Sequence, residues 1–264
     1  MNIQIDERAV VGPKAQIGEN VTIAPYAVIE DDVVIGDGTW IGPHVVVFNG
    51  ARIGKECKIF PSSSISAPPQ DLKYKGEPTT MEIGDRCVIR EFVTLNRGTI
   101  ATGKTTLGSD CLLMAYTHLA HDCLVGNHVI LANAVALAGH VELGDYVIIG
   151  GLTPVHQFCK VGDYAMVGGA FRVTKDVPPY ILAGQSPMTF EKLNIIGLRR
   201  RGFSERVIEL LDQTYRILYR SNLNVSQAVA RIKQEVELIP EVQKVLDFIS
   251  TSKRGIIPAT KGRS

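Results

Sequence analysis

His118, His121, His140 and His156, in the central part of this sequence, are four of its six histidines. Asp122 directly follows His121, and Gly139 directly precedes His140. A neutral imidazole can take a proton from an attacking hydroxyl group, and an adjacent carboxylate can orient its ring. A glycine can present a bare backbone N–H group that would hold a developing oxyanion. These residue types therefore fit general-base chemistry, provided that the fold brings His121 and Gly139 together.

A six-residue hydrophobic period indicates how the fold could do so. Every sixth residue from Ile5 to Val173 gives 29 positions, of which 26 are Ile, Leu or Val. Chance would give roughly 8 such matches. This period is typical of a solenoid in which three short strands form each triangular coil of 18 residues. The sequence therefore predicts a mainly β chain, with a parallel β-helix over residues 1–187.

The interior of such a prism is narrow, and the position four residues after each aliphatic residue is usually small or β-branched. The five cysteines all occupy this position, at residues 57, 87, 111, 123 and 159. Their spacing contains no CxxC pair, so we interpret them as buried thiols rather than disulfides or metal ligands. An odd number of cysteines and no signal peptide indicate a reducing, cytoplasmic environment.

Two insertions, near residues 66–81 and 97–105, interrupt the repeats without changing their phase. Insertions in solenoids project from one face and often border a binding site, so we expect two external loops.

The C-terminal part has a different pattern from the coils. Pro178-Pro179 is expected to end the coils, and a transition segment would follow to about Arg201. Helical periodicity then predicts a helix that starts at Ser204 and two more, over about 225–237 and 240–251. We expect residues 188–264 to form a C-terminal α-helical domain that covers part of the prism wall. Residues 255–264 are expected to be frayed.

The net charge of +1 conceals an asymmetry between the two parts. Residues 188–264 carry 14 Lys or Arg against 8 Asp or Glu, whereas residues 1–187 carry 14 against 19. A basic C-terminal part favours an acidic partner or a phosphate-bearing ligand. A pI near 7.7 and the lack of a recognition motif disfavour nucleic acid. The apolar runs are too short to span a membrane.

The coil period also predicts which side chains meet. Each residue would lie beneath the residue 18 positions later, at a strand spacing of about 4.8 Å. His121 would therefore lie beneath Gly139 and beside His140, and we expect His121, His140 and His156 to form a ladder along one edge. Three interpretations follow: surface histidines that meet by chance, a zinc site shared between subunits, or acyl transfer.

The details favour acyl transfer. Hexapeptide-repeat carbonic anhydrases have two histidines five residues apart, whereas His118 and His121 are three apart. In the acyl-transfer interpretation, His121 takes the proton, Asp122 orients the ring and the Gly139 N–H holds the oxyanion. We therefore expect no metal.

Five segments support this interpretation in combination: QDLKYKGEP (70–78), HLAHDCLVGNHVILANAVALAGHV (118–141), PVHQFCKVGDYAMVGG (154–169), DVPPY (176–180) and NIIGLRRRGFS (194–204). Together they resemble the UDP-N-acetylglucosamine acyltransferase family of lipid A biosynthesis, over essentially the whole chain. The resemblance implies a left-handed β-helix, although crossover connections between parallel strands are usually right-handed. It also implies a homotrimer with active sites in the clefts between neighbouring prisms.

The resemblance further implies a reaction and its residues. The family transfers an (R)-3-hydroxyacyl group from acyl carrier protein to the 3-hydroxyl of UDP-N-acetylglucosamine, with His121, Asp122 and Gly139 at the catalytic positions. The matching substrate-binding positions are Gln70, Asp71, Lys73, His118, His140, His156, Gln157, Gly169, Asn194, Arg200 and Arg201. No diffusible cofactor is implied, because the phosphopantetheine of acyl carrier protein carries the acyl group. Acyl carrier proteins are acidic, so we expect them to meet Lys192, Arg199, Arg206 and Arg216.

Two departures from the family bear on specificity. Ile196 stands where a glutamate often contacts the nucleotide, and Pro187 stands where well-known members have histidine. Gly169 would leave room for a long acyl chain. Two other activities fit the same pattern: N-acylation of a 3-amino UDP-sugar, and transfer from acyl-CoA by another hexapeptide-class enzyme.

Overall fold

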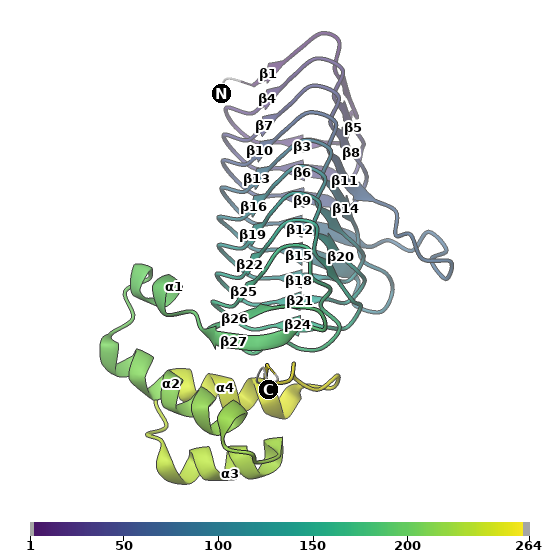
Figure 1. The fold of residues 1–264 in the computed structure, drawn as a ribbon. Helices are drawn as coiled ribbons and strands as arrows, with labels where there is room; N and C mark the ends of the chain where they lie inside the picture. The colour runs from purple at the N-terminus through teal and green to yellow at the C-terminus, as the bar shows by residue number, and fades with distance from the viewer. Residues whose placement is uncertain (1–2, 261–264) are drawn as a thin grey trace.

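The computed structural model describes residues 3–260 of the chain, and most of them form a prism of stacked coils (Figure 1). Three parallel sheets make up its walls. Sheet A contains β1 (Gln4–Ile5), β4 (Thr22–Ile23), β7 (Trp40–Ile41), β10 (Lys58–Ile59), β13 (Val88–Ile89), β16 (Leu112–Leu113), β19 (Ile130–Leu131), β22 (Ile148–Ile149) and β25 (Met166–Val167). It continues through β26 (Ile181–Gly184) and β27 (Thr189–Leu193), which pair in antiparallel fashion.

The other two walls have the same construction. Sheet B contains β2 (Val10–Val11), β5 (Val28–Ile29), β8 (Val46–Val47), β11 (Ser64–Ala67), β14 (Thr94–Asn96), β17 (His118–Leu119), β20 (Ala136–Leu137) and β23 (Pro154–Val155). Sheet C contains β3 (Gln16–Ile17), β6 (Val33–Ile35), β9 (Ala51–Ile53), β12 (Thr80–Ile83), β15 (Lys104–Leu107), β18 (Leu124–Val125), β21 (Glu142–Leu143) and β24 (Lys160–Val161). The predicted parallel β-helix is confirmed.

The strand register follows the 18-residue period. His118 pairs with Ala136 and Leu119 with Leu137, and the same offset recurs in the neighbouring coils. The periodic aliphatic side chains point inward, and Leu119, Leu131 and Leu137 are fully buried. Removal of this apolar surface from water stabilises the prism at about 25 cal/mol per Å².

Each coil turns at three corners, which we name after the sheets that they join. Asp122 lies at the B–C corner, His128 at the C–A corner and Ala134 at the A–B corner. These three residues have φ angles of 61°, 56° and 57°. Such left-handed conformations are uncommon outside glycine, although aspartate, asparagine and histidine adopt them more readily than most residues. The corners therefore fix the direction of the side chains that they carry.

Both insertions leave the prism at the B–C corner, as predicted external loops. Loop 68–79 connects β11 to β12, and loop 97–103 connects β14 to β15. Both project from the same side of the prism (Figure 1). They contact each other, because Nε of Arg97 donates to the Tyr74 hydroxyl at 3.1 Å.

Between the coils and residue 260, the structure contains four helices: α1 (Ile195–Arg200), α2 (Glu205–Arg220), α3 (Val225–Glu235) and α4 (Pro240–Thr251). The three predicted helices are confirmed. Ser204 caps α2, Asn224 and Gln227 form a capping box at α3, and Pro240 opens α4. None of the helices within residues 3–260 is long and apolar enough to cross a membrane.

Two expectations about the C-terminal part were wrong, one about the segment after Pro179 and one about the chain end. The segment after Pro179 is not a plain transition, since it holds β26, β27 and α1. The helices lie at the end of the prism that holds the last coils (Figure 1), and α4 also borders sheet C there, since Phe248 and Thr251 line a cavity with Leu124, Glu142 and Lys160. The Tyr215 hydroxyl makes this attachment specific, because it donates to the Pro179 carbonyl at 2.5 Å.

The chain end up to residue 260 is also ordered by packing. Ile257 is only 1% exposed, and its N–H donates to the Asp176 carbonyl at 2.9 Å. The expected fraying is therefore wrong for residues 255–260, and residues 261–264 lie outside the described part. The proposed domain boundary at residue 187 stays a prediction; it falls in the turn between β26 and β27.

The five cysteines are buried and free, as expected. Burial raises the pKa of Cys123 to about 12 and that of Cys159 to about 11. A thiol reagent should therefore react very slowly with the native protein at pH 8, because reaction needs an accessible thiolate. Titration with Ellman's reagent should count all five thiols only after unfolding in guanidinium. Rapid reaction of any thiol in the native protein would contradict the buried assignment.

Candidate active site

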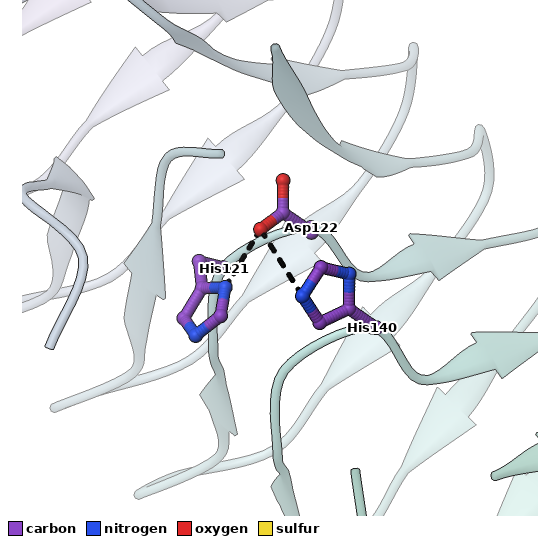
Figure 2. Close-up of side chains that lie close together, drawn as sticks. All are labelled: His121, Asp122 and His140. Carbon is purple, nitrogen blue, oxygen red and sulfur yellow. Dashed lines mark hydrogen bonds and ion pairs between the residues drawn. The ribbon is translucent and has the colours of Figure 1, made fainter. Parts of the chain in front are cut away.

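His121 and Asp122 form a hydrogen-bonded pair at the B–C corner (Figure 2). Nδ1 of His121 lies 2.7 Å from Oδ2 of Asp122. The Asp122 side chain is fully buried, whereas the His121 side chain is 16% exposed. If the carboxylate is ionised, the shared proton belongs to Nδ1, and Nε2 is left with a free lone pair.

Asp122 is ionised at neutral pH because many donors surround it. Burial by itself would raise its pKa, but hydrogen bonds from Thr102, Thr99 and His121, together with the Thr99 backbone N–H, lower that pKa to about 2. The Thr99 N–H donates to Oδ1 at 3.0 Å and the Thr99 hydroxyl to Oδ2 at 2.7 Å. The hydroxyl of Thr102 contacts Oδ1. The site is therefore built around a buried, negatively charged carboxylate.

Gly139 lies directly against the His121 ring. A Cβ atom at position 139 would be 2.6 Å from Cε1 and 2.8 Å from Nε2 of that ring. Only glycine leaves space for the imidazole here. None of the hydrogen bonds among residues 3–260 uses the Gly139 N–H as a donor. The predicted proximity of His121 and Gly139 is therefore present in the fold.

His140 is the second imidazole beside the carboxylate (Figure 2). Its Nε2 lies 3.7 Å from Oδ2 of Asp122, and its ring meets the His121 ring edge-on with centroids 5.3 Å apart. In the next coil, Phe158 stacks on His140 with centroids 4.6 Å apart. The His121–His140 step of the expected ladder is therefore present, Phe158 takes the place above His140 that the coil offset gives to residue 158, and the place of His156 in the ladder stays a prediction. His156 lies in that coil too, with Nδ1 3.1 Å from the Gln157 carbonyl oxygen.

Among residues 3–260, one group of side chains could hold a metal ion: His121, Asp122 and His140. Their ligand atoms lie within 4.8 Å of one another. Their hydrogen bonding does not suit a cation. Both oxygens of Asp122 already accept hydrogen bonds from Thr99 and Thr102, and Nδ1 of His121 is itself one of the donors. A metal ion would have to displace these donors, so the donor set fits a hydrogen-bonded pair better than a zinc centre.

His118 lies close by on the outer face of sheet B. Its Nδ1 is 2.7 Å from the Thr94 hydroxyl. Burial lowers the pKa of His118, the hydrogen bond with Thr94 opposes this, and nearby His121 lowers it further. His118 is therefore held as a neutral imidazole that can take part in hydrogen bonds to an uncharged group.

The other sequence-predicted residues fall into two groups. Loop 68–79 carries Gln70, Asp71 and Lys73 from the same B–C corner as His121. Asn194 and Arg201, in contrast, are attached at the C–A corner. The Asn194 side chain caps α1 and donates to the Tyr164 carbonyl at 3.0 Å, while the Arg201 guanidinium lies 4.5 Å from the centroid of the Tyr146 ring.

Three further predicted positions are exposed and lie apart from the His121–Asp122 pair. Gly169 lies at the A–B corner, and Arg200 lies at the end of α1. Ile196 on the same helix is 66% exposed. One chain therefore does not bring all the predicted residues into a single site.

Comparisons with known proteins identify the family. A family model described as UDP N-acetylglucosamine O-acyltransferase, domain 2, matches residues 176–257. A relative from Thiobacillus denitrificans, named acyl-[acyl-carrier-protein]–UDP-N-acetylglucosamine O-acyltransferase, is 47% identical over 201 residues. The match covers 76% of this chain and 78% of that relative. This chain belongs to the UDP-N-acetylglucosamine O-acyltransferase family.

Solved structures of UDP-N-acetylglucosamine O-acyltransferases agree with the whole fold. The enzyme from Bacteroides fragilis 9343 is 49% identical, with a TM-score of 0.94. LpxA from Acinetobacter baumannii is 45% identical, with a TM-score of 0.93. Each match covers 96% of this chain and 99% of the solved chain. The fold is the left-handed parallel β-helix that the family resemblance implies.

Sequence reasoning missed the threonines that surround the site in this member of the acyltransferase family. Thr99 and Thr102 lie in the second loop, where the six-residue period is broken. Thr94 pairs with His118 although the two are 24 residues apart in the sequence. The insertion between them lengthens the usual offset of 18 residues. A hint was available, because hydroxyl residues recur through the segment TLNRGTIATGKTT (94–106).

The basic residues expected to meet acyl carrier protein are exposed but mostly paired. Arg199 pairs with Glu205 at 2.7 Å, and Arg206 pairs with Glu237 at 2.6 Å. Arg216 likewise pairs with Asp212 at 2.7 Å. Exposed pairs of this kind are weak, so a stronger acidic surface could compete for the arginines.

Substitution of Gly139 tests the contact with His121. The added methyl group of Gly139→Ala would displace the ring, and a misplacement of this order can lower kcat by about 10²-fold. Gly151→Ala is the matched control, since its Cβ would have no neighbour nearer than the Asn133 carbonyl oxygen at 3.2 Å. Turnover assays with circular dichroism should show loss of activity only in Gly139→Ala, with both variants folded. Full activity in Gly139→Ala would contradict the assigned geometry.

Proposed function

We propose that this chain transfers an (R)-3-hydroxyacyl group from acyl carrier protein to the 3-hydroxyl of UDP-N-acetylglucosamine, the first step of lipid A biosynthesis, with His121 as general base. Family membership and the printed activity of its relatives support the reaction. The observation that carries the role of His121 is its 2.7 Å bond to Asp122 beside the unused Gly139 N–H.

The chemistry follows from the positions of these groups. Nε2 of His121 takes the proton of the sugar 3-hydroxyl as its oxygen attacks the thioester carbonyl carbon. The Gly139 N–H donates to the oxyanion of the tetrahedral intermediate, and Asp122 stabilises the imidazolium. When the C–S bond breaks, the imidazolium returns its proton to the thiolate of the carrier's phosphopantetheine. The thioester is already activated, so this sequence of steps requires no metal or diffusible cofactor.

We also propose that the active unit is a homotrimer, and the outer faces of the three walls support this. Sheet C exposes the charged side chains of Arg52, Glu82, Glu142 and Lys160. The outer column of sheet A carries Lys58 on β10 but is uncharged from β13 to β25: Val88, Leu112, Ile130, Ile148 and Met166. The outer column of sheet B is uncharged around neutral His118. Contact of sheet A with sheet B of another copy would bury both apolar faces and leave sheet C in water.

This arrangement would also complete the site. With sheets A and B in the interface, the A–B corner faces the threefold axis. The B–C corner of one chain then meets the C–A corner of the next. His121 and loop 68–79 of one chain would thus face Asn194, Arg200 and Arg201 of its neighbour. Two guanidinium groups suit the diphosphate of the nucleotide.

Mixed trimers test the shared site. His121→Ala alone should lower turnover by roughly 10²–10⁴-fold, since it removes the general base. An Arg200→Ala/Arg201→Ala variant should also be nearly inactive. The two variants, co-expressed with different tags and purified through both, should regain about a third of wild-type activity, because each mixed trimer keeps one intact interface. Inactive mixed trimers would contradict the shared site, and wild-type turnover by His121→Ala would refute the base.

Acyl carrier protein is the proposed donor partner, and the basic surface supports its docking. Charge reversal of Arg199 and Arg206 to Glu should raise the KM for the acyl carrier at low salt, with a smaller effect at high salt because exposed charges are screened. Lys233→Glu on α3 is the charge-matched control for each single reversal, Arg199→Glu and Arg206→Glu. An unchanged KM in the arginine variants, or an equal rise in the lysine variant, would refute this docking surface.

We propose a cytoplasmic location. Five free, buried cysteines support it, because free thiols persist in a reducing compartment.

A further inference from the structure

Loop 97–103 holds the Asp122 carboxylate through two hydroxyl groups. The Thr99 hydroxyl donates to Oδ2 at 2.7 Å, the same oxygen that accepts from His121. The Thr102 hydroxyl contacts Oδ1 and also lies 2.8 Å from the Lys104 carbonyl. The Thr102 hydroxyl donates its single proton to the Asp122 carboxylate and not to the Lys104 carbonyl, because a charged oxygen is the stronger acceptor. The hydroxyl of Thr99 therefore shares with His121 an oxygen of the orienting group.

The loop that carries these hydroxyls is closed on itself. The Gly103 N–H donates to the Thr99 carbonyl at 2.8 Å. Gly98 packs so tightly that a Cβ there would lie 2.4 Å from the Lys104 nitrogen. Thr99 is only 8% exposed. The Thr99 hydroxyl is thus pre-positioned by backbone contacts and does not depend on a bound substrate.

The loop is also tied to the loop that carries the predicted acceptor-binding residues. The Arg97 guanidinium donates to the Tyr74 hydroxyl at 3.1 Å and to the Asn49 carbonyl at 2.6 Å. A continuous path of hydrogen bonds and backbone therefore connects loop 68–79 with Asp122. This path keeps the two loops in one arrangement around the B–C corner.

Few ionisable groups surround His121, so the carboxylate dominates its environment. Asp122 lies at 2.7 Å, and His140 competes for the same oxygen from 3.7 Å. His118, held by Thr94, is the third imidazole of the cluster. Nζ of Lys104, which lies at the end of the loop, forms a salt bridge with Glu82 at 2.9 Å. Besides the imidazoles of His121 and His140, the groups closest to the charge of Asp122 are therefore the hydroxyls of Thr99 and Thr102.

We propose that Thr99 and Thr102 are positioning residues that moderate the His121–Asp122 bond and so set the pH range in which His121 acts as a base. This inference rests on the proposed function of His121. Each hydroxyl takes up part of the carboxylate's charge and fixes its plane. Without them, more of the charge falls on His121, and an opposite charge nearby favours the protonated imidazole. A protonated imidazole cannot accept the proton of the sugar hydroxyl.

The direction of the effect follows. In Thr99→Val and Thr102→Val, the acidic limb of the kcat/KM profile should move to higher pH, since more of the His121 population is protonated at a given pH. At neutral pH, kcat should fall by roughly 10-fold to 10²-fold, as expected for a misplaced catalytic group. Thr99→Ser keeps the hydroxyl and should restore the wild-type profile.

The chain supplies a matched control for the loss of a hydroxyl. Thr106 follows the same loop on β15, and its Oγ1 is buried without a hydrogen-bond partner among the described residues. Thr106→Val therefore removes an equivalent atom that binds nothing, and its pH profile should be unchanged. Thr102→Val changes an exposed loop residue, which keeps the test open if Thr99→Val fails to fold.

The experiment measures kcat/KM against pH for the purified wild type and the variants Thr99→Val, Thr99→Ser, Thr102→Val and Thr106→Val, with thermal unfolding of each. A shifted acidic limb in the two loop valine variants, rescued by serine, supports the proposal. An unshifted limb in both, whatever their kcat, refutes it, as does an equal shift in Thr106→Val. If His121→Ala retains turnover, the proposed base itself fails, which is a separate outcome from an unmoved profile.

Discussion

The strict register between successive coils is the constraint on which the rest of the structure depends. Parallel strands pair at an offset of 18 residues, so each side chain has a fixed neighbour in the next coil. This offset places Gly139 against the His121 ring and His140 beside the carboxylate of Asp122. A shift of one residue would reverse the inward and outward faces of the strands, so the hydrophobic interior itself enforces the geometry of the site.

The register explains why much of the molecule could be predicted from the sequence. The aliphatic period specified the coils, and the same arithmetic brought His121 to Gly139 before any coordinates were known. The same offset puts residue 158 above His140, where Phe158 makes the stack. The three longer helices were marked by Ser204, Pro240 and their apolar spacing.

The rest depended on contacts that no period encodes. Thr99 and Thr102 reach Asp122 from an insertion, where loop closure decides which groups meet. Helix α1 has only six residues, too few for a periodic pattern, and Tyr146 and Tyr164 hold its flanking residues in place. Residues 255–260 are ordered by the pairing of Ile257 with Asp176, which lie far apart in the sequence.

The buried carboxylate joins these features into one account. A charge in the wall of a β-helix is tolerated because hydroxyl, amide and imidazole donors surround it. Those donors come from the corner itself and from an inserted loop. Together they hold His121 with Nδ1 bonded to Asp122 and Nε2 free. The largely apolar walls of sheets A and B, and the basic side chains at the C–A corner, then relate this pair to a second copy of the chain.

A neutron crystal structure at neutral pH would test the central claim, the protonation of the His121 ring, most directly. The account predicts deuterium on Nδ1, directed at Oδ2 of Asp122, and none on Nε2 or on the Asp122 carboxylate. Deuterium on Nε2 with a bare Nδ1, or a protonated Asp122, would contradict it, because His121 could not then accept the proton of the attacking hydroxyl.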